Sequence, residues 1–338
     1  MKKETPIIYL SGFFTACREK DGEKLSVLET VDYWRKRSGA NYRCFSFPYV
    51  YEKAMNKHFF TKRMKEIYEN SVKNKDGIFM DSGAHSFHNF LKKQSYRDLD
   101  IEDLKDNVVK TYVDFVRQDG KKWDVYANFD YVHDNETCFK IQKHFMKKGL
   151  KTLPVVHAGS DMLDYMKRYV EECGCKYMAL GTGGLDGKSN WMGKRKRFDI
   201  IFDVAERYGV KLHGFAITQL SLMFMYPWYS TDSATWAKCS AYGKIIFPDL
   251  NRNILAMVHV SDHALRRGAS DTSYNAMPKD LKRDFVNKVE ASGYDFSKLR
   301  TSLLERYCYN ASIYSKHVHE LKEVVQKTRI KWKSLLPL

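Results

Sequence analysis

Tyr226-Pro-Trp-Tyr-Ser-Thr-Asp-Ser-Ala-Thr-Trp236 is the stretch on which the fold prediction depends. It reads as a short strand that ends in an acidic residue, Asp232, among hydroxyl side chains and between Trp228 and Trp236. A carboxylate in an apolar setting is costly unless a nearby group needs its charge. For a single Asp, the alternative is a cap on the helix predicted to start at Ser233.

Seven other segments read as strands of the same kind. The eight predicted strands are Ile7–Phe14, Tyr42–Val50, Gly77–Gly83, Asp124–Asp130, Lys151–Gly159, Lys176–Gly184, Lys211–Thr218 and Trp228–Ser233. Most are short apolar runs without strict alternation, which is typical of parallel strands that are covered on both faces.

Amphipathic helices are predicted between these strands. Apolar side chains recur at helical spacing over residues 101–116 and 162–169. Glycines that can close a helix stand before the next strand at Gly39, Gly120, Gly149, Gly174 and Gly209. Alternating strands and helices predict an α/β fold, a (β/α)8 TIM-like barrel, with a doubly wound open sheet as the alternative.

The pattern changes after Gly243. Residues 244–247 and 255–260 read as two further short strands, and helices follow from about residue 279. We therefore predict a barrel over residues 1–243 and a C-terminal, mainly helical appendage over residues 244–338.

The composition favours a nucleic-acid partner in a reducing compartment. Lys and Arg number 57 against 41 Asp and Glu, a formal net charge of +16, and such an excess suits a polyanion. The chain has no long apolar run and its start does not resemble a signal peptide, so we expect a cytoplasmic protein without a membrane partner. The seven cysteines lack disulfide-framework spacing, and Cys173-x-Cys175 has no second pair at zinc-finger spacing, which predicts no bound metal.

Acidic and polar residues stand where the predicted strands end. The segments are Asp81-Ser-Gly-Ala-His-Ser-Phe87, Asn128-Phe-Asp130, His157-Ala-Gly159, Gly181-Thr-Gly-Gly-Leu185 and Ser230-Thr-Asp232. In a (β/α)8 barrel the reactive groups lie at this end of the strands. Two facing carboxylates can act as nucleophile and general acid/base, while a third can accept N–H groups of a substrate.

Each of these residues also has a simpler interpretation when it is taken singly. Asp81 and Asp130 could cap helices, His157 could be satisfied inside the protein, and Gly183-Gly184 could be a plain turn. Five such segments in register favour a site.

Taken together, these segments resemble the tRNA-guanine transglycosylase superfamily over roughly residues 77–236. The matching segments are Asp81-Ser-Gly83, Phe129-Asp130, Gly183-Gly-Leu185 and Leu212-His-Gly-Phe215. The resemblance implies that Asp81 is the general acid/base and that Asp130 recognises the base. It also implies that the backbone of Gly183, Gly184 and Leu185 contacts the base and that Asp232 is the nucleophile.

The chain departs from that family's pattern at several positions. Ala84 replaces the second glycine of Asp-Ser-Gly-Gly, and His157 stands in place of a glutamine. The family's zinc motif after the nucleophile is missing. Ser46-Phe-Pro-Tyr49 and the segment from Tyr226 to Ser233 look instead like the phage and bacterial branch that inserts 7-deazaguanine into DNA.

The resemblance therefore implies exchange of guanine in DNA for a free 7-deazaguanine base, such as a preQ0-type precursor, without a cofactor. Candidate substrate-binding residues are Asp130, His157, Gly183, Gly184, Leu185, His85, Phe87 and His213. Candidate nucleic-acid contacts are Lys194, Arg195, Lys196, Arg197, Arg329, Lys331, Trp332 and Lys333. A tRNA transglycosylase, a nucleoside or glycoside hydrolase and an inactive nucleic-acid-binding barrel remain as alternatives.

Overall fold

The computed structural model describes ten segments of the chain, which group into two compact units. The described residues are 6–12, 19–20, 22–51, 61–91, 101–131, 134–181, 191–217, 220–249, 254–262 and 273–316. The first unit, here called the sheet unit, holds residues up to 9, 42–217 and 226–232. The second unit holds residues 10–41, 218–225 and those from 233 onward. Within the described residues no helix is long and apolar enough to cross a membrane.

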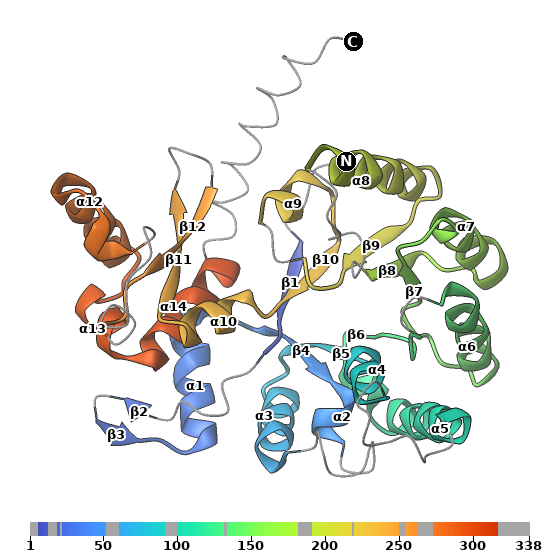
Figure 1. Ribbon diagram of the computed structural model, residues 1–338. Coiled ribbons are helices and arrows are strands. Elements are labelled where there is room, and N and C mark those ends of the chain that lie inside the picture. Colours follow the sequence, from blue (N-terminus) through green and yellow to red (C-terminus); the bar gives the residue numbers. More distant parts are fainter. Residues whose placement is uncertain are drawn as a thin grey trace, which may run out of the picture. The chain divides into compact units, whose positions relative to one another are not determined.

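Eight strands form one sheet, and its registered strand pairs are parallel. They are β1 (Ile7–Leu10), β4 (Tyr42–Ser46), β5 (Gly77–Asp81), β6 (Val125–Tyr126), β7 (Val155–His157), β8 (Tyr177–Gly181), β9 (Lys211–Gly214) and β10 (Ser230–Ser233). Their spatial order is β6-β5-β4-β1-β10-β9-β8-β7 (Figure 1). Within this sheet, successive strands are neighbours except for β6 and β7, which are the two edge strands, and β1 lies beside β10.

This order is compatible with a TIM-like barrel. A bridge between Ala127 and Leu153 connects the segments next to the two edge strands, β6 and β7. A doubly wound sheet would instead reverse its strand order at an internal switch point. The prediction of an α/β fold with eight parallel strands is therefore confirmed.

All eight strands are shorter than predicted. The clearest difference is at Phe47–Val50, which forms the short helix α2 rather than the end of a strand. Pro48 stands at the start of this helix. Proline has no N–H for a strand ladder, and its φ angle suits the first helical turn.

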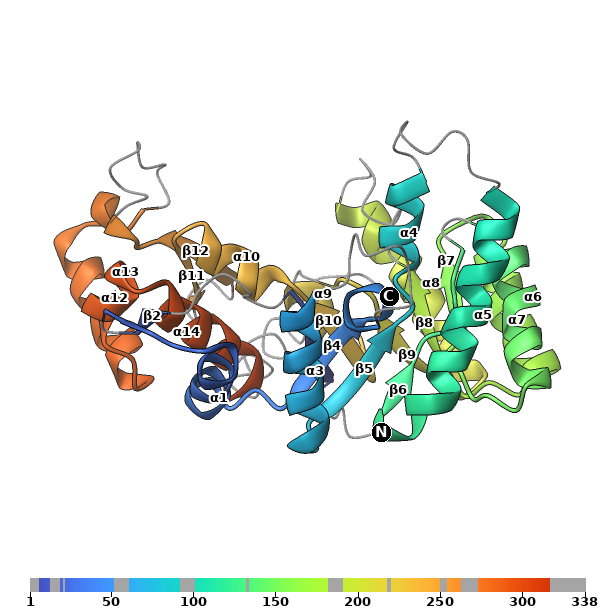
Figure 2. The same ribbon diagram turned by 90° about the horizontal axis from the view of Figure 1, so that it is seen from below.

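Helices alternate with the strands of the sheet unit, and most of them lie outside the strands (Figure 1). They are α3 (Lys62–Lys73), α4 (Ala84–Leu91), α5 (Ile101–Asp119), α6 (Asn135–Lys147), α7 (Met162–Cys173) and α8 (Trp191–Arg207). Both helices that the apolar spacing predicted are present as α5 and α7. Figure 2 shows α4 beyond the end of β5, a position that follows from the tight turn between them.

Apolar side chains fill the space between the strands. This core cluster consists of Tyr9, Cys44, Phe79, Ala127, Leu153, Val155 and Ala179. Because side chains alternate along a strand, the residue two positions after each of these lies on the same face. Asp81 thus shares the face of Phe79, and His157 shares that of Val155.

The second unit is mainly helical and contains two antiparallel strand pairs, one of them formed by β2 (Glu19–Lys20) and β3 (Glu23–Lys24). Its elements include α1 (Val27–Ser38), α9 (Leu220–Met225), α10 (Thr235–Ala241), β11 (Lys244–Asp249), β12 (Ile254–His259), α12 (Lys279–Ala291), α13 (Phe296–Thr301) and α14 (Leu303–Ser315). Strands β11 and β12 pair antiparallel, which confirms both extra strands. Packing groups α1 with this unit, so the units are not contiguous in sequence; the proposed boundary at residue 243 stays a prediction.

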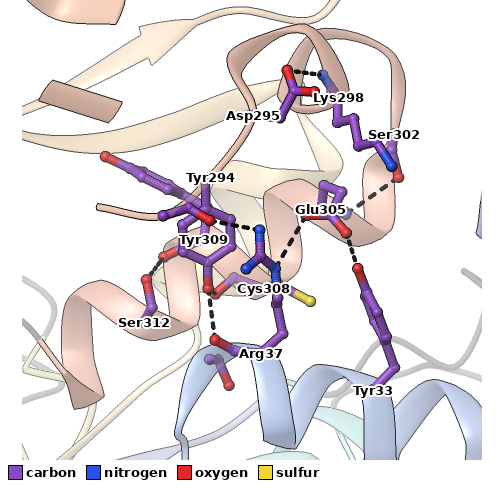
Figure 3. A network of polar contacts seen from close by, with 12 residues as sticks. Tyr33, Arg37, Tyr294, Asp295, Lys298, Ser302, Glu305, Cys308, Tyr309 and Ser312 are labelled. Carbon is purple, nitrogen blue, oxygen red and sulfur yellow. Dashed lines mark hydrogen bonds and ion pairs between the residues drawn. The ribbon is translucent and has the colours of Figure 1, made fainter. Parts of the chain in front are cut away.

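A polar network joins α1 to α14 (Figure 3). The Tyr33 hydroxyl donates a hydrogen bond to the buried Glu305 carboxylate, and Arg37 Nε lies 3.7 Å from Glu305 Oε2. The Arg37 guanidinium also lies over the Tyr294 ring, 4.3 Å from its centroid. These contacts hold residues near the start of the chain against its last described helix.

Candidate active site

Three carboxylates lie at the carboxyl ends of strands of one parallel sheet. Asp81 is the last residue of β5, Asp130 follows β6, and Asp232 lies in β10. The negative charges of Asp130 and Asp232 both act on the Asp81 carboxyl, so the three side chains lie near one another. The predicted convergence of these aspartates is thus found within the sheet unit.

Asp81 has the surroundings of a proton-transfer group. Burial, followed by the charges of Asp130 and Asp232, raises its pKa from 3.8 to about 7. The Gly83 N–H, 3.2 Å from Oδ2, and the Ser46 hydroxyl act in the opposite direction but more weakly. A group with a pKa near neutrality can both give and accept a proton at pH 7.

The turn after Asp81 requires glycine at its third position. Gly83 has a φ of +78°, and a Cβ there would lie 2.3 Å from Cδ of Pro48. Any other residue would be strained and would collide with that ring. The backbone conformation of this turn therefore explains the glycine of the Asp-Ser-Gly segment, independently of any role of Asp81 in catalysis.

Ser82 connects this turn to Asp130. Its hydroxyl donates to Asp130 Oδ1 at 2.7 Å and accepts from the Ala84 N–H at 3.3 Å, in the first turn of α4. The sequence analysis named Ser82 only as part of the Asp-Ser-Gly segment. In the sequence, the only sign of a role for Ser82 is that it follows Asp81 directly.

His157 faces Asp130, and its position depends on two further residues. His157 Nε2 lies 3.3 Å from Asp130 Oδ2. The Asn135 amide bonds both backbone groups of His157, at 2.8 Å to its N–H and 3.2 Å to its carbonyl. A Cβ on Gly181 would lie 2.5 Å from His157 Nδ1, so glycine makes room for the imidazole. Sequence reasoning missed Asn135, which is simply the first residue of a helix.

Asp232 is held by a strained backbone segment after β9. Its Oδ1 accepts a hydrogen bond of 2.7 Å from the Ala216 N–H, and Ala216 has a φ of +52°. Positive φ is unusual for alanine and persists where the surroundings impose it. His213 Nε2 lies 3.7 Å from the same oxygen.

Asp130 and Asp232 do not cap helices. Helix α10 begins at Thr235 with Ala234 as its N-cap, and Asp134 caps α6. The simpler interpretations of Asp130 and Asp232 are therefore wrong, since both carboxylates bond within the site.

Three other predicted residues lie in different surroundings. His213 has no exposed surface and stacks on Phe79 with centroids 4.3 Å apart, so its contact with a substrate stays a prediction. Phe87 is 2% exposed and packs edge-on against Phe129, so it is a core residue of α4. His85 is exposed and contacts Asn89 on the same helix. Base stacking by His85 or Phe87 stays a prediction.

The two tryptophans that flank Asp232 in the sequence pack in separate places. Trp228 lies edge-on to Phe202, with centroids 4.8 Å apart. Trp236 packs on Trp34 in the second unit, with centroids 5.3 Å apart. Trp228 is thus part of the core of the sheet unit, and Trp236 is part of the core of the second unit.

Four of the eight predicted nucleic-acid contacts, and three of the predicted substrate-binding residues, lie outside the described residues. Lys196 and Arg197 are exposed on α8, whereas the side chains of Lys194 and Arg195 on the same helix are not described. The positions outside the described part are Gly183, Gly184, Leu185, Arg329, Lys331, Trp332 and Lys333. Their roles stay predictions.

Neither a metal cluster nor a disulfide occurs in the part of the chain that the structure describes. No group of three or more His, Cys, Asp or Glu residues there could hold a metal ion, and none of the six described cysteines forms a disulfide. Compared with known proteins, the chain matches no family and no curated protein.

Proposed function

We propose that the protein is a transglycosylase that exchanges guanine in DNA for a 7-deazaguanine base on a (β/α)8 barrel. The observation that carries this proposal is the trio of Asp81, Asp130 and Asp232 at one edge of the sheet, with the pKa of Asp81 raised to about 7. Aspartates of unequal surroundings can divide the work of nucleophile, proton carrier and base recognition.

In the first half of the reaction, a carboxylate oxygen of Asp232 attacks C1′ of the deoxyguanosine. The C1′–N9 bond breaks, its electron pair leaves with the base, and protonated Asp81 gives the base its proton. A covalent glycosyl ester on Asp232 results. The raised pKa of Asp81 keeps a protonated fraction available for this step near pH 7.

In the second half, a free 7-deazaguanine base enters the same position. Its N9–H proton passes to the Asp81 carboxylate as N9 attacks C1′. The bond between C1′ and the Asp232 oxygen breaks, and the electron pair returns to the carboxylate. Protons and charges balance over the two halves, so no external acid, base or cofactor is consumed.

Asp130 is suited to recognise a guanine-type base. Such a base presents N–H donors on neighbouring positions of its Watson–Crick edge, and a carboxylate accepts two of them together. The Ser82 hydroxyl and His157 hold the Asp130 carboxylate from either side. The target nucleotide has to leave the stack, because C1′ and the base edge are not accessible together inside a duplex.

The test offers labelled guanine or a labelled 7-deazaguanine base with plasmid DNA and, in parallel, with total tRNA. Label in DNA supports the proposal, and label in tRNA alone would assign the site to RNA. Release of free guanine without incorporation would indicate a hydrolase. Binding of nucleic acid with neither outcome would indicate an inactive barrel.

A further inference from the structure

A chain of buried polar side chains runs behind Asp232 across three adjacent strands. The Tyr177 hydroxyl in β8 lies 2.5 Å from Ser230 Oγ in β10, and Ser230 Oγ lies 2.6 Å from His213 Nδ1 in β9. The other ring nitrogen, His213 Nε2, lies 3.7 Å from Asp232 Oδ1. Both nitrogens of one imidazole thus face polar groups.

The surroundings of this chain are otherwise apolar. His213 and Ser230 have no exposed surface, and the imidazole lies between Phe79, centroids 4.3 Å apart, and Phe215, centroids 4.8 Å apart. Polar groups in such a place cost free energy unless hydrogen bonds compensate them. Apolar side chains would pack at these positions without this cost, so we look for a functional role of the polar side chains.

The groups at the two ends of this hydrogen-bond chain, Asp232 and Tyr177, determine which atom donates and which accepts. Burial lowers the pKa of His213, so the ring is neutral, with one nitrogen that donates and one that accepts. Asp232 Oδ1 already accepts a hydrogen bond from the Ala216 N–H, so a donor nitrogen suits the position facing it, which places the proton on Nε2. Nδ1 then accepts from Ser230, which in turn accepts from Tyr177. Burial raises the pKa of Tyr177, so its phenol keeps the proton that this arrangement needs.

We propose that His213 is a positioning residue for Asp232, held by Tyr177 and Ser230 as the tautomer with its proton on Nε2. This inference rests on the proposed function. The Ala216 N–H, 2.7 Å from Oδ1, holds one carboxylate oxygen by a hydrogen bond, and His213 Nε2 faces the same oxygen at 3.7 Å, beyond hydrogen-bond distance. In this proposal the imidazole orients Oδ1, and Oδ2 is the oxygen that attacks C1′.

The same two donors would act in both halves of the exchange. Once Oδ2 carries the sugar, Oδ1 is the carbonyl oxygen of the ester, and it regains negative charge as the bond to C1′ breaks. Donors that are already aimed at this oxygen need no reorganisation at that moment. Loss of the hydrogen bonds among Tyr177, Ser230 and His213 should therefore slow formation and breakdown of the glycosyl ester without weakening nucleic-acid binding.

The first test measures the tautomer and needs no activity. Protein labelled with ¹⁵N-histidine has 11 histidines, and comparison with His213→Gln assigns the His213 signals. The expected ring signals are those of a neutral imidazole with its proton on Nε2, and Ser230→Ala should shift the population toward Nδ1–H. A proton on Nδ1 in the wild type would overturn the inference.

The second test measures the rate of glycosyl-ester formation at saturating DNA. Ser230→Ala should lower this rate roughly 10- to 100-fold with unchanged Kd, because a misplaced nucleophile loses near-attack geometry. Thr231→Val is the matched control, since within the described residues the buried Thr231 hydroxyl has no hydrogen-bond partner. Equal rates for the two variants would overturn the inference.

His213→Gln and His213→Leu separate positioning from packing. The glutamine amide can still present an N–H near Asp232, so His213→Gln should keep more of the rate than His213→Leu, with both proteins folded by circular dichroism. Equal loss in both would contradict a donor role. If the wild type forms no ester at all, the proposed function fails, and the tautomer measurement still shows whether the hydrogen-bond chain exists.

Discussion

The three site aspartates are chemically identical, and their neighbours make them different. Asp81 has two negative charges nearby and one amide donor, Asp130 has a hydroxyl and an imidazole, and Asp232 accepts a backbone N–H. Burial and the two neighbouring charges raise the pKa of Asp81, whereas the partners of Asp130 and Asp232 set the orientations of those side chains. The division of roles proposed above follows from these surroundings.

Asp232→Asn should abolish exchange and leave nucleic-acid binding intact. The amide has the same size but is a poor nucleophile, so the covalent route is lost. Denaturing gels should show a protein–DNA adduct with the wild type and none with the variant. Asp124→Asn is the control, because that carboxylate precedes β6 at the opposite end of the strands. A variant rate within about tenfold of wild type would contradict the assignment of the nucleophile.

Asp81→Asn should raise the melting temperature at pH 8 while it abolishes activity. The folded-state pKa, about 7, lies above the ordinary value of 3.8, so the folded protein binds the proton more tightly than the unfolded chain does. Stability from this group is therefore greatest below about pH 4 and is lost as the pH rises through 7. Asparagine removes the buried charge, so the gain should appear at pH 8 and vanish near pH 4. A melting-temperature difference that does not change with pH would contradict the raised pKa.

At the scale of elements, the second unit depends on one buried amide in α14. Asn310 Oδ1 accepts from the Ile246 N–H at 2.7 Å, and its Nδ2 donates to Ser240 Oγ at 2.8 Å and to the Lys244 carbonyl at 3.0 Å. The side chain has no exposed surface. It thereby joins α10 and β11 to the last described helix.

Asn310→Ala should destabilise the second unit by on the order of 3 kcal/mol, because buried donors and acceptors lose their partner at about 1–3 kcal/mol each. Urea unfolding followed by tryptophan fluorescence suits this test, since Trp34 and Trp236 pack together in the same unit. Asn74→Ala is the control; its half-buried amide bonds to Asn70, and it should cost less than about 1 kcal/mol. Equal losses would show that the Asn310 contacts contribute little.

At the scale of the whole molecule, a formal net charge of +16 favours association with a polyanion. Charge alone does not select DNA, and phosphate contacts carry no base information. Under the proposed function, base specificity would come from Asp130 and its neighbours, and lysines and arginines would provide the affinity for phosphates.

Replacing Lys194, Arg195, Lys196 and Arg197 together by glutamine should make the salt dependence of DNA binding shallower. Each lost phosphate contact changes the log–log slope by about 0.9 on a duplex and about 0.7 on a single strand. Fluorescence anisotropy at several salt concentrations measures this slope. Lys140→Gln with Lys167→Gln is the control, since both lysines are exposed and already paired with a glutamate on their own helix. An unchanged slope in the fourfold variant would remove α8 from the interface.

Much of the fold could be predicted from the sequence because its signals are local. Apolar runs, helical spacing and glycines at helix ends depend on neighbours within a few residues. They sufficed for the alternation of strands and helices, and for Asp81, Asp130 and Asp232 at strand ends. They failed at Phe47–Val50, where Pro48 starts a helical turn, and they did not indicate that α1 packs against α14.

The chemistry of the site was decided by tertiary structure. Residues that are remote in sequence cause three features of the site. These are the raised pKa of Asp81, the positive φ of Ala216 where its N–H bonds to Asp232, and the burial of His213. Desolvation and charge act through space, and the strands bring these groups together only when the sheet forms. The sequence by itself determined which acids stand at the strand ends; the folded sheet determined which one holds a proton and which one is held in place.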